Sequence, residues 1–229
     1  MGPSGIPVLF SDSWLLAVSK PAGMPVQPDP TGDADLLTLL RRARKEPGLE
    51  LAHRIDRPVS GVVLLARGSG ATSALHALFR ERRMEKRYWA IVEGRVEESQ
   101  AQLRHHLAHD ARKHKAVVTK AAEGGEACTR VRSLAQGDRY ALVECMPEGG
   151  AFHQIRAQLA AWGHPIKGDV KYGARRAEKD RSIALHARTL RFVHPFTGEE
   201  VRLEAPPPQA MPWPVLVKQS GALPWSHGG

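Results

Sequence analysis

Residues 51–61 read Leu-Ala-His-Arg-Ile-Asp-Arg-Pro-Val-Ser-Gly and lead directly into the apolar run Val62–Ala66. A short unbroken apolar run of this kind is typical of a strand that is buried on both faces. The charged side chains before it would therefore stand on a loop held by a rigid element, which favours a functional site. On the pattern alone, Asp56 equally well caps a turn while Arg54 and Arg57 are solvated.

Length and charge set the class of protein. The 229 residues suit one domain, or one domain with a small annex. Lys and Arg number 33 against 24 Asp and Glu, a net charge of +9 that favours a polyanionic partner such as nucleic acid. Cys128 and Cys145 are too few for a disulfide framework or a cysteine-based zinc site. The chain shows neither a secretory signal nor an apolar stretch long enough for a membrane span, so we expect a cytoplasmic location.

The remaining pattern predicts a mixed α and β protein with few helices. Most connections are too short for parallel crossovers, so the strands are expected to be mostly antiparallel or mixed. We expect helices over residues 36–44 (capped by Asp33 or Asp35), 71–79 and 153–162. Strands are expected at 8–10, 14–18, 62–66, 88–92, 183–193 and 200–204, and residues 101–146 read as mostly short strands.

Two further segments carry polar side chains that suggest a site. Residues 150–156 read Gly-Ala-Phe-His-Gln-Ile-Arg, and Arg156 lies at the edge of the helix's apolar stripe, where it would reach a phosphate or a carboxylate. Taken alone, Arg156 reads as an ordinary surface residue. Residues 184–195 form an amphipathic strand with a weak signal. A nucleotide-binding role is not favoured, because the chain has no phosphate-binding loop and Gly68-Ser69-Gly70 lacks the third glycine of a dinucleotide turn.

Residues 105–110 read His-His-Leu-Ala-His-Asp and invite a metal interpretation. No second carboxylate or cysteine pair at ligand spacing supports it. We therefore expect no metal, and interpret these residues as part of a basic hairpin that faces nucleic acid.

Together the segments resemble the catalytic domain of the RluA-type pseudouridine synthases, over nearly the whole chain and in order. One departure is Val59, where many members carry Thr, and a second is that no S4-type RNA-binding domain precedes the first strand. The matching segments are Ser19–Val26, His53–Asp56 with Ser60-Gly61, Lys86–Ala90, His153–Arg156, Gly163–Ile166 with Gly168-Asp169, and Leu185–Ala187.

The resemblance implies an enzyme that isomerises uridine within RNA and uses no cofactor. Asp56 occupies the position of the essential aspartate, which acts at the ribose or at the uracil ring; the sequence leaves both open. Arg156 is the matching cation that would keep this carboxylate ionised. Tyr88 matches the aromatic residue that stacks on the extruded uracil.

Other positions carry weaker implications. Arg54 matches a residue that fills the place of the displaced base, although a buried salt bridge would use the same side chain. His53 is expected to be a structural hydrogen-bonding residue. Ile155 and Leu190 are expected to line the pocket wall, or to belong simply to the core.

The implied fold is of the α/β (α+β) type, with a long mixed or antiparallel sheet, flanking helices and a central active-site cleft. We expect a catalytic domain over residues 1–208 and a tail over 209–229, in which Trp213 and Trp225 dock a short helix. The partner is expected to be RNA, ribosomal or transfer, bound by a monomer without membrane or metal. Basic residues would position it: Arg80, Arg82, Arg83, Lys86 and Arg87; Arg104, His105, His106, Arg112, Lys113, His114 and Lys115; and Arg175, Arg176, Lys179 and Arg181.

Two other functions stay open from the sequence. A catalytically silent RNA-binding module would keep the fold without needing Asp56, Tyr88 or Arg156. A nucleosidase or glycosidase would need a second carboxylate near Asp56, for which Asp169 is the candidate.

Overall fold

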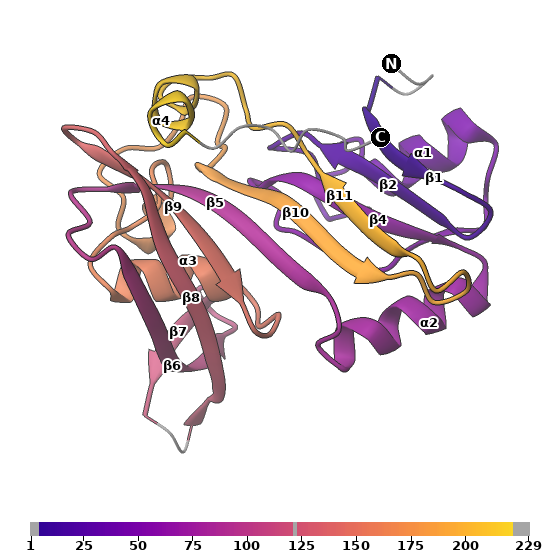
Figure 1. The fold of residues 1–229 in the computed structure, drawn as a ribbon, viewed down its shortest axis with the longest axis horizontal. Helices are drawn as coiled ribbons and strands as arrows, with labels where there is room; N and C mark the ends of the chain where they lie inside the picture. The colour runs from indigo at the N-terminus through magenta and orange to yellow at the C-terminus, as the bar shows by residue number, and fades with distance from the viewer. Residues whose placement is uncertain (1–4, 121–122, 222–229) are drawn as a thin grey trace. The chain divides into compact units, whose positions relative to one another are not determined.

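A computed structural model describes residues 5–120 and 123–221 of the chain (Figure 1). Within these residues it contains eleven β-strands and four α-helices. The chain divides into two compact units. Unit 1 comprises the described residues up to Lys86 together with Ala187–Pro207, and unit 2 comprises Arg87–His186 and the described residues from Pro208.

Unit 1 is an antiparallel arrangement around the buried strand that the sequence predicts. Strand β4 pairs with β2 and β3, β1 pairs with β2, and β10 pairs with β11, all antiparallel. Helix α2 packs against β4. The elements are β1 (Val8–Ser11), β2 (Leu15–Lys20), α1 (Leu36–Arg44), β3 (Leu49–Leu51), β4 (Ser60–Arg67), α2 (Ser69–Arg80), most of β10 (Leu185–Val193) and β11 (Glu200–Glu204).

Local chemistry accounts for the elements of unit 1. Val62–Ala66 is buried on both faces, as the unbroken apolar run predicts. Leu64 joins Leu75 of α2 in the hydrophobic core. Helix α1 begins after Asp35, whose carboxylate accepts a hydrogen bond from the Thr38 amide at 2.9 Å. This confirms the predicted helix and selects Asp35 over Asp33 as its cap.

Unit 2 is built on long antiparallel strands. Strand β8 pairs with β6 on one side and with β9 on the other, β9 pairs with β5, and β6 with β7. Helix α3 packs against this sheet (Figure 1). The elements are most of β5 (Glu85–Glu93), β6 (Gln100–Asp110), β7 (Lys115–Thr119), β8 (Gly125–Gln136), β9 (Tyr140–Pro147), α3 (Gln154–Ala161), the 3-10 helix η2 (Val170–Tyr172) and α4 (Trp213–Gln219).

The prediction of strands over residues 101–146 is confirmed, but two of them are much longer than expected. Strands β6 and β8 have 11 and 12 residues. Only one of their faces is covered, so polar residues alternate with apolar ones and no long apolar run marks their length. In β6, for example, buried Leu103 and Leu107 are separated by exposed or half-buried polar residues.

The C-terminal segment adds the short helix α4 to unit 2. Trp213 and Leu216 are buried, and α4 packs against β8 and β9. This confirms a docked helix in the tail, while Trp225 lies outside the described residues.

Gly61 gives a test of how tightly β4 packs within unit 1. Its φ is +116°, and a Cβ at this position would lie 2.2 Å from the Ala187 carbonyl oxygen. We expect Gly61→Ala to lower the free energy of unfolding by about 3 kcal/mol or more, measured by urea denaturation. Gly70→Ala is the control, because Gly70 lies in α2 with open space around it. There alanine should stabilise slightly, and equal effects of the two variants would contradict the packing argument.

Candidate active site

Asp56 lies on the loop between β3 and β4, as the sequence predicts, and is half-buried. Its backbone carbonyl accepts a hydrogen bond from the Val59 amide at 3.0 Å, which closes a turn just before β4. The carboxylate is thus carried on a short segment whose end is anchored in the most buried strand of unit 1. This placement suits a catalytic group that must be held in one position.

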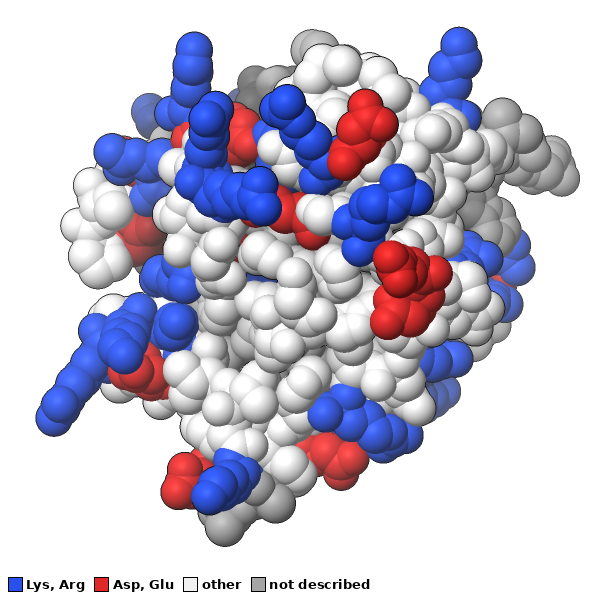
Figure 2. All heavy atoms as spheres, turned by 90° about the vertical axis from the view of Figure 1, so that its left-hand side faces the viewer, with Lys and Arg blue, Asp and Glu red and all other residues white. Residues whose placement is uncertain are grey.

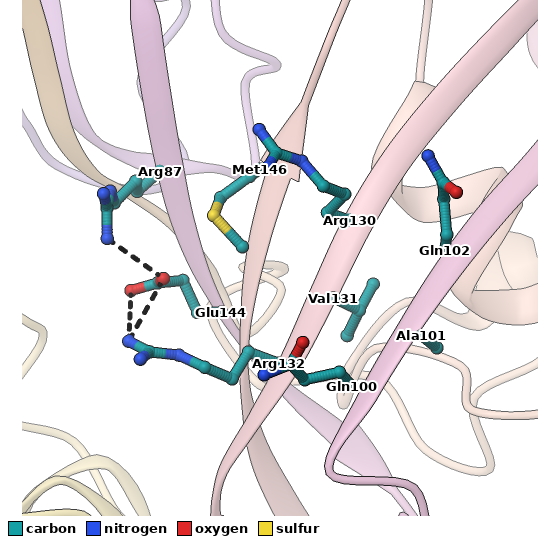
Figure 3. Close-up of a pocket in the computed structure, with 9 residues that line it drawn as sticks. All are labelled: Arg87, Gln100, Ala101, Gln102, Arg130, Val131, Arg132, Glu144 and Met146. Carbon is teal, nitrogen blue, oxygen red and sulfur yellow. Dashed lines mark hydrogen bonds and ion pairs between the residues drawn. The ribbon is translucent and has the colours of Figure 1, made fainter.

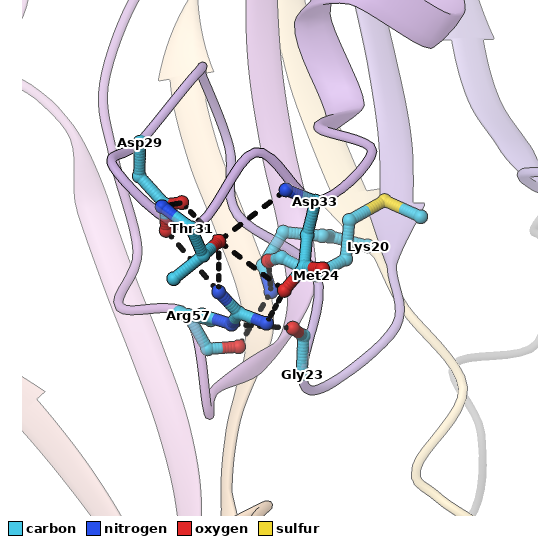
Figure 4. Close-up of polar contacts among 7 residues, drawn as sticks. All are labelled: Lys20, Gly23, Met24, Asp29, Thr31, Asp33 and Arg57. Carbon is cyan, nitrogen blue, oxygen red and sulfur yellow. Dashed lines mark hydrogen bonds and ion pairs between the residues drawn. The ribbon is translucent and has the colours of Figure 1, made fainter.

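Lys20, at the end of β2, is the buried cation beside this loop. Its Nζ donates a hydrogen bond to the Pro21 carbonyl oxygen at 2.9 Å. It also donates to the carbonyl oxygens of Met24 at 2.8 Å and Arg57 at 3.2 Å (Figure 4). Burial lowers the pKa of Lys20 to about 7, although the negative charge of Asp56 opposes that shift. The ammonium therefore joins the end of β2 to the residue that follows Asp56.

Arg57 fastens the long loop after β2 to the same segment. Its guanidinium donates to the Gly23 carbonyl at 2.9 Å, to Thr31 Oγ1 at 2.9 Å and to Asp29 at 3.3 Å, and it also bonds Asp33 (Figure 4). The interpretation of Arg57 as a merely solvated residue is therefore wrong. Neither Arg57 nor Lys20 received a role from the sequence pattern, because their partners are backbone carbonyls and acids up to 37 positions away.

His53 serves a structural purpose in the same loop. Its Nε2 accepts a hydrogen bond from the Leu64 amide of β4 at 3.0 Å, and its ring lies 4.9 Å from that of Phe79. Burial lowers the pKa of His53 to about 4, and the charge of Lys86 adds to the shift. His53 is therefore a neutral acceptor near pH 7, which agrees with the structural role predicted for it.

The pKa of His53 predicts a pH dependence of stability. The folded protein binds a proton at His53 less readily than the unfolded chain does. The contribution of His53 to the free energy of unfolding is therefore complete above about pH 6.5 and is lost as the pH falls toward 4. We expect the wild type to lose about 3 kcal/mol more over this range than His53→Gln, which keeps an acceptor. Urea denaturation between pH 4 and 7 measures this. The control His76→Gln removes an exposed histidine, and its pH profile should follow the wild type.

Arg156 forms the buried ion pair of unit 2. Its Nε and Nη2 donate to the two carboxylate oxygens of Asp169 at 2.7 and 2.9 Å, and both residues are buried. The interpretation of Arg156 as an ordinary surface residue is wrong. The prediction that it reaches sideways to an anion is met here by a carboxylate. Asp169 orients the guanidinium through two parallel bonds, the strongest geometry for this pair.

A hydrogen-bonded chain of rings continues from Arg156. His153 Nε2 lies 2.8 Å from Arg156 Nη1, and His153 Nδ1 lies 2.9 Å from the Tyr172 hydroxyl. That hydroxyl accepts a hydrogen bond from the Ala116 amide at 2.7 Å. The Arg156 guanidinium also lies 5.0 Å from the centre of the Tyr172 ring. Helix α3 is thereby tied to η2 and to β7 at the end that carries Arg156.

The Arg156–Asp169 pair predicts a large effect of a small substitution. Asp169→Asn keeps the shape but removes the charge that balances a buried guanidinium, so we expect the free energy of unfolding to fall by about 3 kcal/mol. Chemical denaturation measures the loss. In the control Asp180→Asn, an exposed acid that bonds Ser182 is changed, and the loss should stay below about 1 kcal/mol. Similar losses in both variants would show that the pair does not hold this part of unit 2.

Tyr88 lies on the same face of the sheet of unit 2 as α3. Tyr88, Cys145 and Val131 pair in one row across β5, β9 and β8. Thr129, two positions before Val131, bonds Gln158 of α3 at 2.7 Å, so this row faces the helix. Tyr88 is half-buried.

The remaining predicted residues are placed as follows. Arg54 is exposed on the Asp56 loop, and Leu190 lies in the hydrophobic core of unit 1. Ile155 is buried in α3. Unit 1 therefore carries Asp56, Arg54 and Leu190, and unit 2 carries the others. A pocket-lining role for Ile155 and Leu190 stays a prediction.

The face of the unit 2 sheet that lies opposite α3 carries a hollow of about 400 Å³ lined by arginines (Figure 3). Arg87 and Arg132 both reach Glu144, at 3.4 and 3.3 Å, and the Glu144 side chain is only 7% exposed. Arg130 and the amides of Gln100 and Gln102 complete the rim. Arg87 therefore points away from the α3 face, because neighbouring residues in a strand alternate between faces.

The predicted basic residues are partly engaged in ion pairs. Arg83 pairs with Glu81 at 3.4 Å and Arg104 with Glu126 at 3.3 Å, all with exposed side chains that leave them accessible to an anion. Burial lowers the pKa of Lys86 to about 8, which weakens its case as a surface contact. Figure 2 shows one face of the molecule on which Lys and Arg side chains surround a central uncharged area, with fewer Asp and Glu among them.

The part of the chain that the structure describes holds no group of three metal-ligating side chains. In β6 the alternation of faces sends His106 to the side opposite His105 and His109, which separates the histidines of that motif. None of the helices in the described ranges has the length and apolarity to cross a membrane.

Comparisons with known proteins agree with this architecture. A family model described as RNA pseudouridylate synthase matches residues 14–161. The tRNA pseudouridine synthase C of Vibrio parahaemolyticus serotype O3:K6 (strain RIMD 2210633) is 34% identical over 228 residues, covering 90% of this chain and 92% of that protein. The ribosomal large subunit pseudouridine synthase C of Escherichia coli (strain K12) is 36% identical over 215 residues, covering 87% of this chain and 66% of that protein.

A solved structure gives the same result for the fold. Human RNA pseudouridylate synthase domain containing 1 aligns with a TM-score of 0.78 and 26% identity, covering 94% of this chain and 88% of that one. The class defined by these matches is that of isomerases acting on uridine in RNA. This chain belongs to the RNA pseudouridylate synthase family.

Proposed function

We propose that this protein converts specific uridines in structured RNA to pseudouridine and that Asp56 is its catalytic aspartate. The observation that carries the proposal is the Asp56 loop. The segment His53–Asp56, which resembles the family, leads into the buried strand β4. Lys20 and Arg57 hold this loop through hydrogen bonds to backbone carbonyls. The motifs around Tyr88 and Arg156 support the same reaction.

The reaction is an isomerisation, so the substrate and the product contain the same atoms and no co-reactant is needed. The bond between uracil N1 and ribose C1′ breaks, and a bond between uracil C5 and C1′ forms. The C5 hydrogen leaves as a proton, and N1 gains one. Asp56 would supply the carboxylate that acts at the ribose or at the uracil ring, and Tyr88 would stack on the extruded base. Because no electrons or groups are exchanged with another molecule, the chemistry needs no cofactor.

Arg156 would contribute a fixed positive charge to substrate binding. A guanidinium held bidentately by Asp169 loses little freedom when it meets an RNA oxygen, so its orientation is set before RNA binds. Arg54, exposed on the Asp56 loop, would fill the place of the displaced base. The net charge of +9 would draw the polyanion to the protein.

The RNA class follows from the relatives only as a proposal. The tRNA synthase of Vibrio parahaemolyticus aligns over 92% of its length, whereas the ribosomal synthase of Escherichia coli aligns over 66%. Transfer RNA is therefore the first substrate to test and ribosomal RNA the second. We further propose that the protein acts as a monomer in the cytoplasm.

Tritium release tests the proposal. With tRNA and rRNA fragments labelled at uracil C5, the wild type should release tritium into water, because forming the new bond expels that hydrogen. Asp56→Asn should reduce the rate by about a thousandfold or more, while circular dichroism and RNA binding stay close to the wild type. Asp138→Asn, in the exposed turn between β8 and β9, is the matched control and should keep full activity.

Three other results would contradict the proposal. Full activity of Asp56→Asn would remove the catalytic role of Asp56. RNA binding without release from either RNA class would favour a silent binding module. Free uracil among the products would favour a nucleosidase.

A further inference from the structure

An aromatic cluster is exposed beside Arg156 in unit 2. The ring of Phe152 stacks on that of His153, with centroids 3.8 Å apart and planes 18° apart. His109 of β6 meets Phe152 edge-on at 4.7 Å. Phe152 is 41% exposed, and His109 is exposed as well. The cluster therefore leaves aromatic rings accessible at the surface beside Arg156.

The cluster is held in place by the network of the candidate site. His153, on which Phe152 stacks, is bonded to Arg156 on one ring nitrogen and to Tyr172 on the other. The backbone of His153 is left-handed, with φ of +52°, a conformation that costs energy for a non-glycine residue. Because His153 is fixed in this way, Phe152 is a rigid surface only one side chain away from Arg156.

Cations flank the same surface. Lys115 Nζ lies 5.4 Å from the centre of the Tyr172 ring, and Lys171 Nζ donates to the His114 carbonyl at 3.2 Å. Lys113, in the turn between β6 and β7, is 71% exposed, and its nearest acid, Asp110, is 3.9 Å away. Exposed aromatic rings among lysines are the combination that binds single-stranded nucleic acid, in which bases stack and phosphates meet cations.

We propose that Phe152 and His109 form a stacking surface for an unpaired base of the RNA substrate, close in the strand to the target uridine. The inference rests on the proposed function, because Arg156 marks where the substrate lies. Every base has a π-face, so this contact would hold the RNA without selecting its sequence. The flanking lysines would bind the phosphates on either side.

Phe152→Ala tests the surface by the affinity for RNA. Stacking of one base on an aromatic ring predicts a rise of about tenfold in Kd and KM, larger than any fall in kcat, and Phe152→Trp should restore binding. Phe196→Ala is the matched control. Phe196 is 45% exposed and stacks on Trp14, with ring centroids 5.3 Å apart. The variant therefore removes a similar exposed ring, but from unit 1. Its Kd should stay within twofold of the wild type.

RNA with single abasic sites identifies the stacked base. In the wild type, removing one base near the target should weaken binding by the same factor as Phe152→Ala, and the two changes together should cost no more than either alone. Equal Kd values for Phe152→Ala and wild type, or additive losses at every abasic position, would overturn the inference. If Phe196→Ala weakens binding as much as Phe152→Ala, the effect is not specific to this surface and the inference also fails.

These outcomes are independent of the proposed reaction. The Kd measurements need no turnover, so Phe152-dependent binding without tritium release would leave the stacking surface in place and refute the isomerase. Tritium release by the wild type together with normal RNA binding by Phe152→Ala would support the isomerase and refute the stacking surface.

Discussion

The ammonium group of Lys20, buried at the end of β2, needs oxygen atoms around it because no bulk water reaches it. Three backbone carbonyls supply them, two from the loop after β2 and one from Arg57. Those carbonyls are thereby drawn to one point, and Asp56 is the residue next to Arg57. The solvation of this cation thus helps to order the Asp56 loop, together with the hydrogen bonds of the Arg57 guanidinium. Burial still lowers the pKa of Lys20 to about 7, because three carbonyl oxygens replace bulk water only in part.

Unit 2 satisfies a buried cation in the other usual way, with a carboxylate. Arg156 is neutralised by Asp169, and its Nη1 lies within hydrogen-bond distance of His153 Nε2. Because a buried charge without its partner is costly, the two residues and the ring chain behind them hold α3 and η2 in one arrangement. The same chain fixes Phe152 at the surface. One requirement, the neutralisation of a guanidinium, therefore orders both Arg156, the candidate substrate-binding cation, and the surface beside it.

Elements that depend on neighbouring residues in the chain could be predicted well. The buried run Val62–Ala66, the helix capped by Asp35 and the docked helix at Trp213 were all found where local pattern placed them. The lengths of β6 and β8 were not predicted, because half-covered strands interleave polar residues with apolar ones. Their length depends on pairing with each other over eight positions. The paired residues are far apart in the sequence, so a short stretch of it does not show the pairing.

For the candidate site, the sequence by itself determined the family, the order of its motifs and the loop that carries Asp56, since these depend only on which residues follow one another. It also predicted that Arg156 would reach an anion. Only the tertiary structure decided that this anion is Asp169, 13 positions away, and that Arg57 binds a loop up to 34 positions away. The solvation of Lys20 was likewise invisible, because backbone carbonyls are present at every residue and carry no sequence signal. Which of them surround a buried charge is settled by packing alone.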